Sequence, residues 1–229
     1  MIYFDDVSKK FEFKDKVYYS IKNLNLNIES GEFVVFMGHS GAGKTTLMKL
    51  ITREYLPSSG HIYFNSVDIS TFNRSQMNKY RRNIGMIYQD YKLISDMTVY
   101  ENVAFAMEVS GRTNQEIKDD VPHVLELVGL AGKKDYFPTQ LSGGEKQRVA
   151  IARAIVNNPD VILADEVTGN LDPENTRDII KILKKINSFG TTIILTTHDK
   201  SVANLINERL IVLEAGKIVK DSGNKNNNL

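Results

Sequence analysis

The chain has 229 residues, 41% of them hydrophobic, which suffices to bury the core of one large α/β domain or of a domain with a subdomain. Its 29 Lys and Arg against 28 Asp and Glu leave a net charge of +1, which removes the usual whole-domain signature of nucleic-acid binding. The absence of cysteine excludes disulfides and thiolate metal sites.

The N-terminus, Met1–Asp6, carries acids where a signal peptide carries a basic and then an apolar run. The longest apolar runs, such as Phe33–Met37, have about five residues, against the ~20 needed to cross a bilayer. We therefore expect that this chain does not cross a membrane by itself.

The N-terminal part predicts antiparallel strands. Runs at Ile2–Val7, Val17–Ile28 and His61–Ile69 read as strands, and polar turns such as Ser58–Gly60 separate them. Further along, short apolar runs alternate with helical segments, which predicts a largely parallel sheet with crossover helices. These runs are Phe33–Met37, Ile84–Tyr88, Val161–Ala164, Thr192–Thr196 and Arg209–Leu213.

The middle of the chain, about residues 75–158, is more helical. Thr113–Glu116 matches a capping box, and apolar residues follow it at helical spacing. A last hairpin is predicted at Arg209–Lys220, turning at Ala215 and Gly216. The tail 222–229 is polar and low in complexity, so we expect a single domain over residues 1–221 followed by a disordered tail.

A glycine loop at Gly38–Thr45 (GHSGAGKT) fits the phosphate-binding pattern G-x-x-x-x-G-K-[ST], between an apolar strand and a helix-forming run. That context disfavours the alternative of a tight turn without a ligand. We expect Lys44 to reach the β- and γ-phosphates, Thr45 to bind Mg²⁺ and Thr46 to contact the α-phosphate, while the His39 side chain faces solvent. The residues predicted to bind nucleotide here are Gly38, His39, Ser40, Gly41, Ala42, Gly43, Lys44, Thr45 and Thr46.

The apolar strand Val161–Ala164 ends in two carboxylates, Asp165 and Glu166. Adjacent strand residues point to opposite sides, so the two acids can have separate tasks. Asp165 would hold Mg²⁺, as phosphoryl-transfer sites require, and Glu166 would act as general base toward the attacking water. A charged turn after a strand is common, so this pattern is weak without its neighbours.

The signature segment, Leu141–Arg148 (LSGGEKQR), is the most informative stretch of the chain. Ser142 and Glu145 form a capping box, which helix stability alone explains. Two glycines in a first turn weaken a helix, and Gly143 and Gly144 therefore need another reason. Because glycines allow a ligand to approach the backbone and a helix N-terminus attracts anions, we interpret this segment as a second anion site.

Taken together, the motifs resemble those of the ATP-binding cassette (ABC) ATPases, in family order over about residues 1–221. The resemblance implies a RecA-like P-loop core, an N-terminal antiparallel β-subdomain and an inserted α-helical subdomain. It also implies that two chains sandwich two ATP molecules, with Ser142 and Gly144 reaching the nucleotide of the other subunit. Val167 departs from the family, which usually has Pro there; both residues favour extended backbone, and we expect Glu166 to be less rigidly placed.

Two further site residues come from the resemblance alone. Gln89 matches the Q-loop glutamine, which meets Mg²⁺ and the attacking water and links the site to the helical subdomain. His198 matches the switch histidine that contacts the γ-phosphate, although a lone His at a strand end is usually just polar. The resemblance thus implies catalysis by Lys44, Gln89, Glu166 and His198, with Mg²⁺ held by Thr45, Gln89 and Asp165.

Phe11 matches the aromatic residue that stacks on adenine in this family, with Tyr18 and Tyr19 as rivals and a core position as the alternative. Gly169–Asp172 resembles the D-loop, which crosses the dimer interface. Because Pro173 follows, Asp172 equally predicts a simple helix start, and the two interpretations are compatible.

Within the family, Tyr88–Leu93 and Thr98–Val103 resemble the cell-division branch. In that branch the ATPase works with a membrane protein that transports no known substrate. The pair transmits ATP-driven conformational changes across the membrane to peptidoglycan hydrolases. The resemblance implies that the chain forms a homodimer when it binds ATP. It also implies that the chain is peripheral to the cytoplasmic face of the bacterial inner membrane, with its membrane partner docked on the helical segment at about residues 75–158. Lipoprotein-releasing and efflux ATPases carry similar motifs and remain alternatives, as does an ATP-gated scaffold with little turnover.

Overall fold

The computed structural model describes residues 1–14 and 16–223, and the chain divides into two compact units. The first unit combines Met1–Arg81 with Thr192–Leu229, and the second is the continuous stretch Arg82–Thr191. The second unit holds most of the predicted helical middle and continues beyond it through one more strand and helix. Each unit is a mixture of helices and strands, as the sequence predicts.

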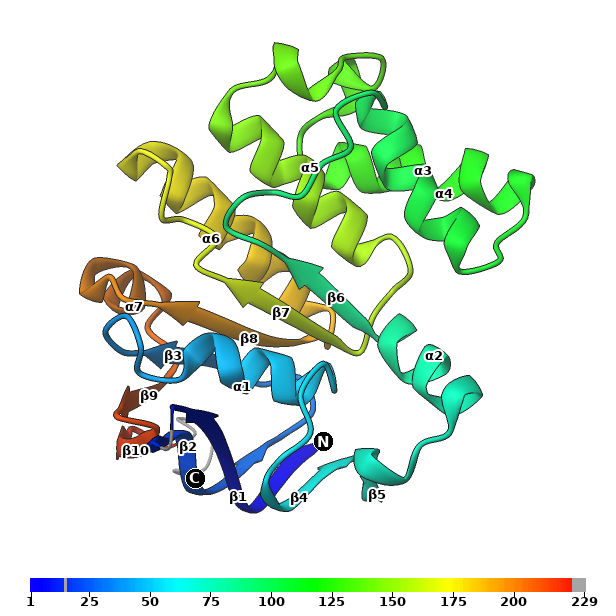
Figure 1. Ribbon diagram of the computed structural model, residues 1–229. Coiled ribbons are helices and arrows are strands. Elements are labelled where there is room, and N and C mark those ends of the chain that lie inside the picture. The colour runs from blue at the N-terminus through cyan, green and yellow to red at the C-terminus, as the bar shows by residue number, and fades with distance from the viewer. Residues whose placement is uncertain (15, 224–229) are drawn as a thin grey trace. The chain divides into compact units, whose positions relative to one another are not determined.

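The first unit contains an antiparallel sheet with the strand order β2-β1-β4-β5 (Figure 1). Its strands are β1 (Ile2–Phe13), β2 (Lys16–Ile28), β4 (Ser59–Phe64) and β5 (Val67–Asp68). The predicted polar turn at 58–60 is wrong in part, because Ser59 and Gly60 already belong to β4. Gly60 has φ +78°, and a Cβ there would lie 2.4 Å from the carbonyl oxygens of Asp5 and Asp6, so this strand irregularity requires glycine.

The same unit contains parallel strands, with β3 (Phe33–Met37) between β8 (Thr192–Thr197) and β9 (Arg209–Glu214). β8 is buried throughout, which explains its continuous apolar run. The predicted hairpin is confirmed, since β10 (Lys217–Asp221) pairs antiparallel with β9. The helices of this unit are α1 (Lys44–Ile51), which contacts β2, α7 (Lys200–Ile206), a 3₁₀ turn at Ile69–Thr71 and nearly all of α2 (Arg74–Arg82).

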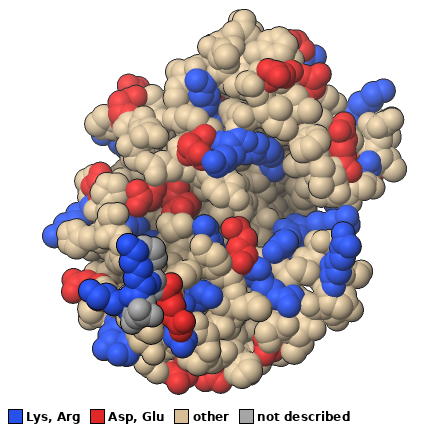
Figure 2. Space-filling view, in the orientation of Figure 1, with Lys and Arg blue, Asp and Glu red and all other residues tan. Residues whose placement is uncertain are grey.

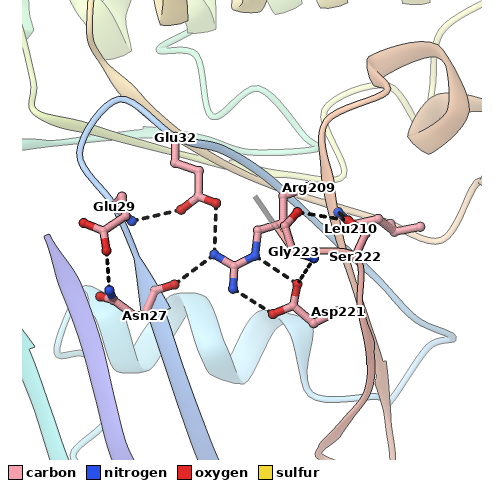
Figure 3. A network of polar contacts seen from close by, with 8 residues as sticks. All are labelled: Asn27, Glu29, Glu32, Arg209, Leu210, Asp221, Ser222 and Gly223. Carbon is pink, nitrogen blue, oxygen red and sulfur yellow. Dashed lines mark hydrogen bonds and ion pairs between the residues drawn. The ribbon is translucent and has the colours of Figure 1, made fainter. Parts of the chain in front are cut away.

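Arg209 joins the last hairpin to the end of β2 (Figure 3). Its guanidinium donates two hydrogen bonds to the Asp221 carboxylate, at 2.7 and 2.9 Å, and further bonds of 2.9 Å to the Asn27 carbonyl and to buried Glu32. The bonds from Arg209 hold the pKa of Asp221 below its ordinary value. Ser222 bonds to the backbone of Leu210, so the hydrogen-bonded chain runs slightly past residue 221, while 224–229 lie outside the described residues.

The second unit pairs β6 (Ile84–Ile87) parallel with β7 (Val161–Asp165). Its helices are α3 (Val99–Val109), α4 (Asn114–Leu127), α5 (Gly143–Ile155) and α6 (Pro173–Ser188), with short 3₁₀ turns at Ala131–Lys133 and Pro138–Gln140. The predicted capping boxes at Thr113 and Ser142 are confirmed, and each starts a helix. Among the described residues, no helix is long and apolar enough to cross a membrane.

The outer face of α2 is cationic although the chain as a whole is nearly neutral. The helix has no acid, and its exposed Arg74, Lys79 and Arg81 form no ion pair within the described residues. Figure 2 shows Lys and Arg gathered over this helix. Met77 and Tyr80 form its buried face. The net charge of +1 therefore conceals a local separation of charge.

Candidate functional site

The glycine loop follows β3 and has backbone angles at its turning points that favour glycine. Gly41 and Gly43 have φ of +81° and +111°. A Cβ on Gly43 would lie 2.5 Å from the Ser20 carbonyl oxygen, and one on Gly38 would lie 2.5 Å from that of Leu213. The loop is therefore held between β2 and β9, and a side chain at either position would displace it.

The helix that follows the loop, α1, has no side-chain cap at its N-terminus. Helices α3 to α7 all begin with a capping Ser, Thr or Asp. The backbone N–H groups of an uncapped first turn attract anions. The buried ammonium of Lys44 donates to the loop's own carbonyls, at 2.7 Å to Gly38 and 3.3 Å to His39. The loop end of α1 is thus a compact concentration of positive potential.

The neighbouring threonines differ in exposure. Thr45 is exposed, whereas the Thr46 hydroxyl lies 2.7 Å from the Ser20 hydroxyl of β2. The His39 side chain is exposed, in agreement with the prediction for that residue. Sequence inspection gave no reason to select Ser20, because its role depends on β2 passing beside the loop.

His198 lies at the same end of the unit as the glycine loop. Met37 and Thr197 are register partners in the parallel pair β3–β8, so Gly38 and His198 are the next residues on neighbouring strands. The Gly38 N–H bonds to the Thr197 carbonyl at 3.4 Å. His198 is exposed, and Asp199 after it caps α7. The parallel sheet therefore brings the predicted histidine to the start of the loop.

Phe11 belongs to an aromatic cluster. It pairs across the sheet with Tyr18, and their rings stack with centroids 5.6 Å apart. The ring of Tyr55 meets Phe11 edge-on at 5.4 Å, and the Lys9 ammonium lies 5.2 Å from the Phe11 centroid. Tyr55 lies just beyond α1 and was missed from the sequence because it belongs to no motif. Because their rings stack, Phe11 and Tyr18 form one aromatic surface. They are therefore not alternative candidates for stacking on adenine.

In the second unit, Gln89 and the acidic strand end lie together. Ile87 pairs with Ala164 in the parallel ladder, so Gln89 and Glu166 follow neighbouring strands at the same edge. A Cβ on Gly169 would lie 3.2 Å from the Gln89 amide nitrogen and 3.4 Å from the Glu166 carbonyl oxygen. The turn after β7 therefore packs against the Gln89 side chain through Gly169.

Glu166 is not extended. The strand ends at Asp165, and Glu166 has φ +48°, a left-handed conformation uncommon for a residue with a side chain. The turn closes with a 3.1 Å bond from the Gly169 N–H to the Glu166 carbonyl, and Val167 is only 2% exposed. The expectation of extended backbone at this residue is wrong because the tight turn determines its conformation. Val167 acts as an apolar anchor beneath the turn.

The signature segment starts α5 with a two-way cap. The Ser142 hydroxyl accepts from the Glu145 N–H at 3.3 Å, and the Glu145 carboxylate accepts from the Ser142 N–H at 2.9 Å. Lys133 also bonds to Glu145, and this contact, followed by the Ser142 bond, lowers the pKa of the Glu145 carboxyl. Ser142 is exposed, as a residue that reaches a ligand must be.

The two glycines of the signature segment have contacts within the chain itself. A Cβ on buried Gly144 would lie 2.2 Å from the Asn175 side-chain oxygen, and one on Gly143 would lie 3.2 Å from the Tyr91 hydroxyl. Close packing against α6 therefore explains Gly144 without any ligand. Ligand approach, predicted for both glycines, is therefore not the only reason for Gly144, and Asn175 could not be foreseen because it belongs to a helix about 30 residues further along the chain.

Asp172 caps α6, accepting from the N–H groups of Glu174 and Asn175, and Pro173 is the first helical residue. The predicted helix start is confirmed; a role across a dimer interface stays a prediction.

The donor set predicted for Mg²⁺ is one hydroxyl, one amide oxygen and one carboxylate, from Thr45, Gln89 and Asp165. No group of three or more His, Cys, Asp or Glu that could hold a metal occurs among the described residues. A single carboxylate nevertheless fits Mg²⁺, which keeps several waters and shares its oxygen ligands with substrate phosphates.

The ABC transporter family pattern matches residues 21–169. The chain belongs to this family and is of its ATP-hydrolysing cassette class. It is 48% identical over 202 residues to the cell division ATP-binding protein FtsE of Bacillus subtilis, covering 88% of this chain and 89% of that protein. It is 43% identical to a methionine import ATP-binding protein, MetN 1 of Paraburkholderia xenovorans, covering 96% of this chain but 64% of that protein.

Among solved structures, the chain is similar to a dimeric, post-hydrolysis structure of the ATP-binding cassette MJ0796 bound to ADP and Pi. The sequences are 36% identical, the TM-score is 0.86, and the match covers 96% of this chain and 97% of that one. The predicted cassette fold is thereby confirmed.

Proposed function

We propose that this chain is the ATP-hydrolysing subunit of a bacterial cell-division complex, acting with a membrane partner of the FtsX kind. The observation that carries the proposal is its 44–48% identity to FtsE proteins of three genera over 88–96% of its length. The uncapped α1 beneath the glycine loop and the acidic end of β7 supply the chemistry that such an ATPase needs. Hydrolysis would drive a change of shape in the partner rather than transport.

The glycine loop would bind the phosphates of ATP. In the structure the Lys44 ammonium already bonds to two loop carbonyls, so it needs only to exchange them for β- and γ-phosphate oxygens. Thr46 would contact the α-phosphate beside Ser20, and Phe11 with Tyr18 would offer a stacking surface for adenine. The chain thus has groups for each part of ATP.

Glu166 would take a proton from the attacking water, with Gln89 beside it to orient that water. His198, next to the glycine loop, would contact the γ-phosphate. Thr45, Gln89 and Asp165 would hold Mg²⁺, which when bound neutralises charge on the phosphates. The tight turn at Val167 would keep the Glu166 carboxylate at a fixed place for this task.

Two copies would close around two ATP molecules. Ser142 and the N–H groups of Gly143 and Gly144 would then meet the γ-phosphate held by the other copy. The similarity to dimeric MJ0796 structures supports a dimer. Because ATP is contacted from both sides and ADP lacks the γ-phosphate, ATP favours closure.

Turnover measured for the wild type beside Glu166→Gln tests the proposal. We expect the variant to lose about 10²–10⁴-fold, the range for removal of a general base, and to remain an ATP-bound dimer in size exclusion with ATP and Mg²⁺. Glu208→Gln, an exposed glutamate of the first unit, is the control and should leave turnover unchanged. Equal, negligible rates for the wild type and Glu166→Gln would instead support an ATP-gated scaffold.

A groove between α3 and α4 suits the docking of the membrane partner. It has a volume of about 530 Å³, and apolar side chains form much of its lining. Phe105 is 40% exposed and lies among the apolar residues of this lining, so its ring is available to pack against a partner. The apolar lining includes Met97, Tyr100, Ala104, Phe105 and Ile117.

The rim of this groove is acidic. Its lining includes three acids, Asp96, Glu101 and Glu108, and one basic residue, Lys118. Cytoplasmic loops of membrane proteins carry an excess of Lys and Arg, so an acidic rim complements them. The occupant is therefore a short cytoplasmic helix of the membrane partner, with an apolar side chain for the groove and basic residues beside it.

Co-purification from membranes tests this docking. Phe105→Asp should abolish recovery of the partner while the isolated chain keeps its ATP turnover. Phe189→Asp, at the exposed end of α6, is a matched control that should retain the partner. Equal recovery by both variants would remove the α3–α4 groove as the docking site. Recovery of an importer or efflux subunit in place of an FtsX-like protein would correct the proposed pathway.

A further inference from the structure

The segment after Gln89 has an unusual backbone. Tyr91 and Lys92 both have positive φ, of +60° and +50°, although neither is glycine. Such left-handed residues are uncommon, and bulky ones persist only where their surroundings hold them. Two such residues occur in succession, and they begin two positions after the predicted site residue Gln89. A specific contact is therefore expected to hold them.

Arg153 supplies that contact. Its guanidinium donates to the Tyr91 carbonyl at 2.8 Å and to the Lys92 carbonyl at 2.6 Å. Arg153 lies in the last turn of α5, and burial lowers the pKa of its guanidinium, which still stays charged far above neutral pH. One planar side chain therefore holds both strained residues in place.

The same segment also meets the start of α5. The Tyr91 hydroxyl lies 3.2 Å from the place of a Cβ on Gly143. Tyr91 thus extends along α5, with its ring end at the first turn and its carbonyl bound in the last turn. A shift of the Gln89 segment relative to α5 would break both contacts.

We infer that Arg153 is a positioning residue, which fixes the Gln89 segment to α5 so that Gln89 and Ser142 move as one body when nucleotide binds. This inference rests on the proposed ATP-driven dimerisation. Without Arg153, Gln89 could respond to ATP while Ser142 stayed behind. The expected defect is therefore in dimerisation and turnover rather than in the first binding of ATP to the glycine loop.

Backbone variants at Lys92 test the strained conformation directly. The Lys92 side chain is exposed and, among the described residues, its one ion pair is with Asp90, so Lys92→Gly and Lys92→Val remove the same ion pair. Glycine adopts positive φ freely, whereas β-branched valine resists it. In a Glu166→Gln background, we expect Lys92→Val to need roughly tenfold more ATP for half-maximal dimerisation and Lys92→Gly to match its parent.

Side-chain variants at Arg153 test the clamp. Arg153→Met keeps the aliphatic stem but loses both bonds, and it should raise the ATP requirement for dimerisation at least as far as Lys92→Val. Arg153→Lys, with one ammonium, should restore part of the response. Asn157→Ala is the structural control, because it removes a 3.0 Å bond from the end of α5 to the Ala106 carbonyl without touching the Gln89 segment.

The outcomes separate the two proposals. If Arg153→Met lowers the melting temperature as Asn157→Ala does but leaves the ATP requirement unchanged, Arg153 is merely structural and the inference fails. The same conclusion follows if Lys92→Gly and Lys92→Val behave alike. If the Glu166→Gln parent itself does not dimerise with ATP, the proposed function fails instead.

Discussion

The N-termini of α1 and α5 were both predicted to bind phosphate, and they are built in different ways. The first turn of α1 has no side-chain cap, and a buried lysine is bonded beside it. The first turn of α5 carries a capping box, so a serine hydroxyl and a carboxylate already satisfy two of its donors. A glutamate at that end also weakens its positive potential. We therefore expect α1 to bind phosphate by itself. We expect α5 to contact a phosphate only when a second copy of the chain already holds it.

The largest expected effect is at α1. Lys44→Ala removes the ammonium that would meet the β- and γ-phosphates, and we expect ATP turnover to fall by about 10²–10³-fold and ATP-dependent dimerisation to disappear. Titration calorimetry with ATP and Mg²⁺ checks the loss of affinity, and Lys217→Ala, an exposed lysine of the same unit, is the control. Undiminished affinity in Lys44→Ala would mean that the phosphates bind elsewhere.

Gly144→Ala separates packing from ligand contact at α5. The new methyl would collide with the Asn175 side chain, and we expect a loss of about 1–3 kcal/mol in the free energy of unfolding. Asn175→Ala removes the two atoms that would lie closest to that methyl. Combined with Gly144→Ala, it should restore most of the stability.

Turnover of this double variant is the informative measurement. If turnover stays low after stability returns, Gly144 also serves a ligand, as the sequence argument proposed. If turnover returns with stability to the level of Asn175→Ala alone, packing against α6 is the sole requirement for Gly144.

Ser142→Ala should cost about 1 kcal/mol of unfolding free energy, the usual value for loss of an N-cap. Thr113→Ala, which removes the equivalent cap of α4, is the matched control and should cost a similar amount. ATP-dependent dimerisation should weaken only in Ser142→Ala, because only that hydroxyl belongs to the proposed interface. Equal dimerisation by the two variants would reduce Ser142 to a helix cap.

The smallest effect concerns pH at the α5 cap. The pKa of Glu145 is lowered in the folded chain, so its carboxylate stabilises the fold above the ordinary glutamate pKa of about 4.3 and loses that contribution as the pH falls through the lower folded value. Glu145→Gln keeps the capping geometry without the charge. The difference in melting temperature between wild type and variant should be largest near pH 6 and should shrink below about pH 4; a constant difference would contradict the assignment.

The sequence predicted those elements whose conformation is determined by residues close together in the chain. Continuous apolar runs located β3, β7 and β8, because inner strands of a parallel sheet are buried on both faces. An apolar run also located β6, although only alternate residues of that strand are buried. The capping boxes at Thr113 and Ser142 were readable because all their atoms lie within four residues.

What the sequence did not reveal comes from residues that meet only after folding. Gly144 lacks a side chain because Asn175 packs against it, and Arg153 of α5 bonds to the carbonyls of Tyr91 and Lys92. The extent of β1 was underestimated because repeated register shifts interrupt its alternation against β2. The left-handed backbone of Glu166 results from a tight turn, and no single residue of the sequence predicts that turn.

The Arg209 cluster has a consequence for the order in which the chain is made. It joins Asn27 and Glu32 to Asp221, so the first unit needs segments from both sides of the second unit. Because synthesis proceeds from the N-terminus, the second unit can fold while β3 still lacks β8 and β9, both its neighbours. A nascent chain would therefore hold β3 as an apolar strand with two open edges until β8 emerges from the ribosome, and with one open edge until the last hairpin follows. During translation β3 therefore needs protection from pairing with other chains.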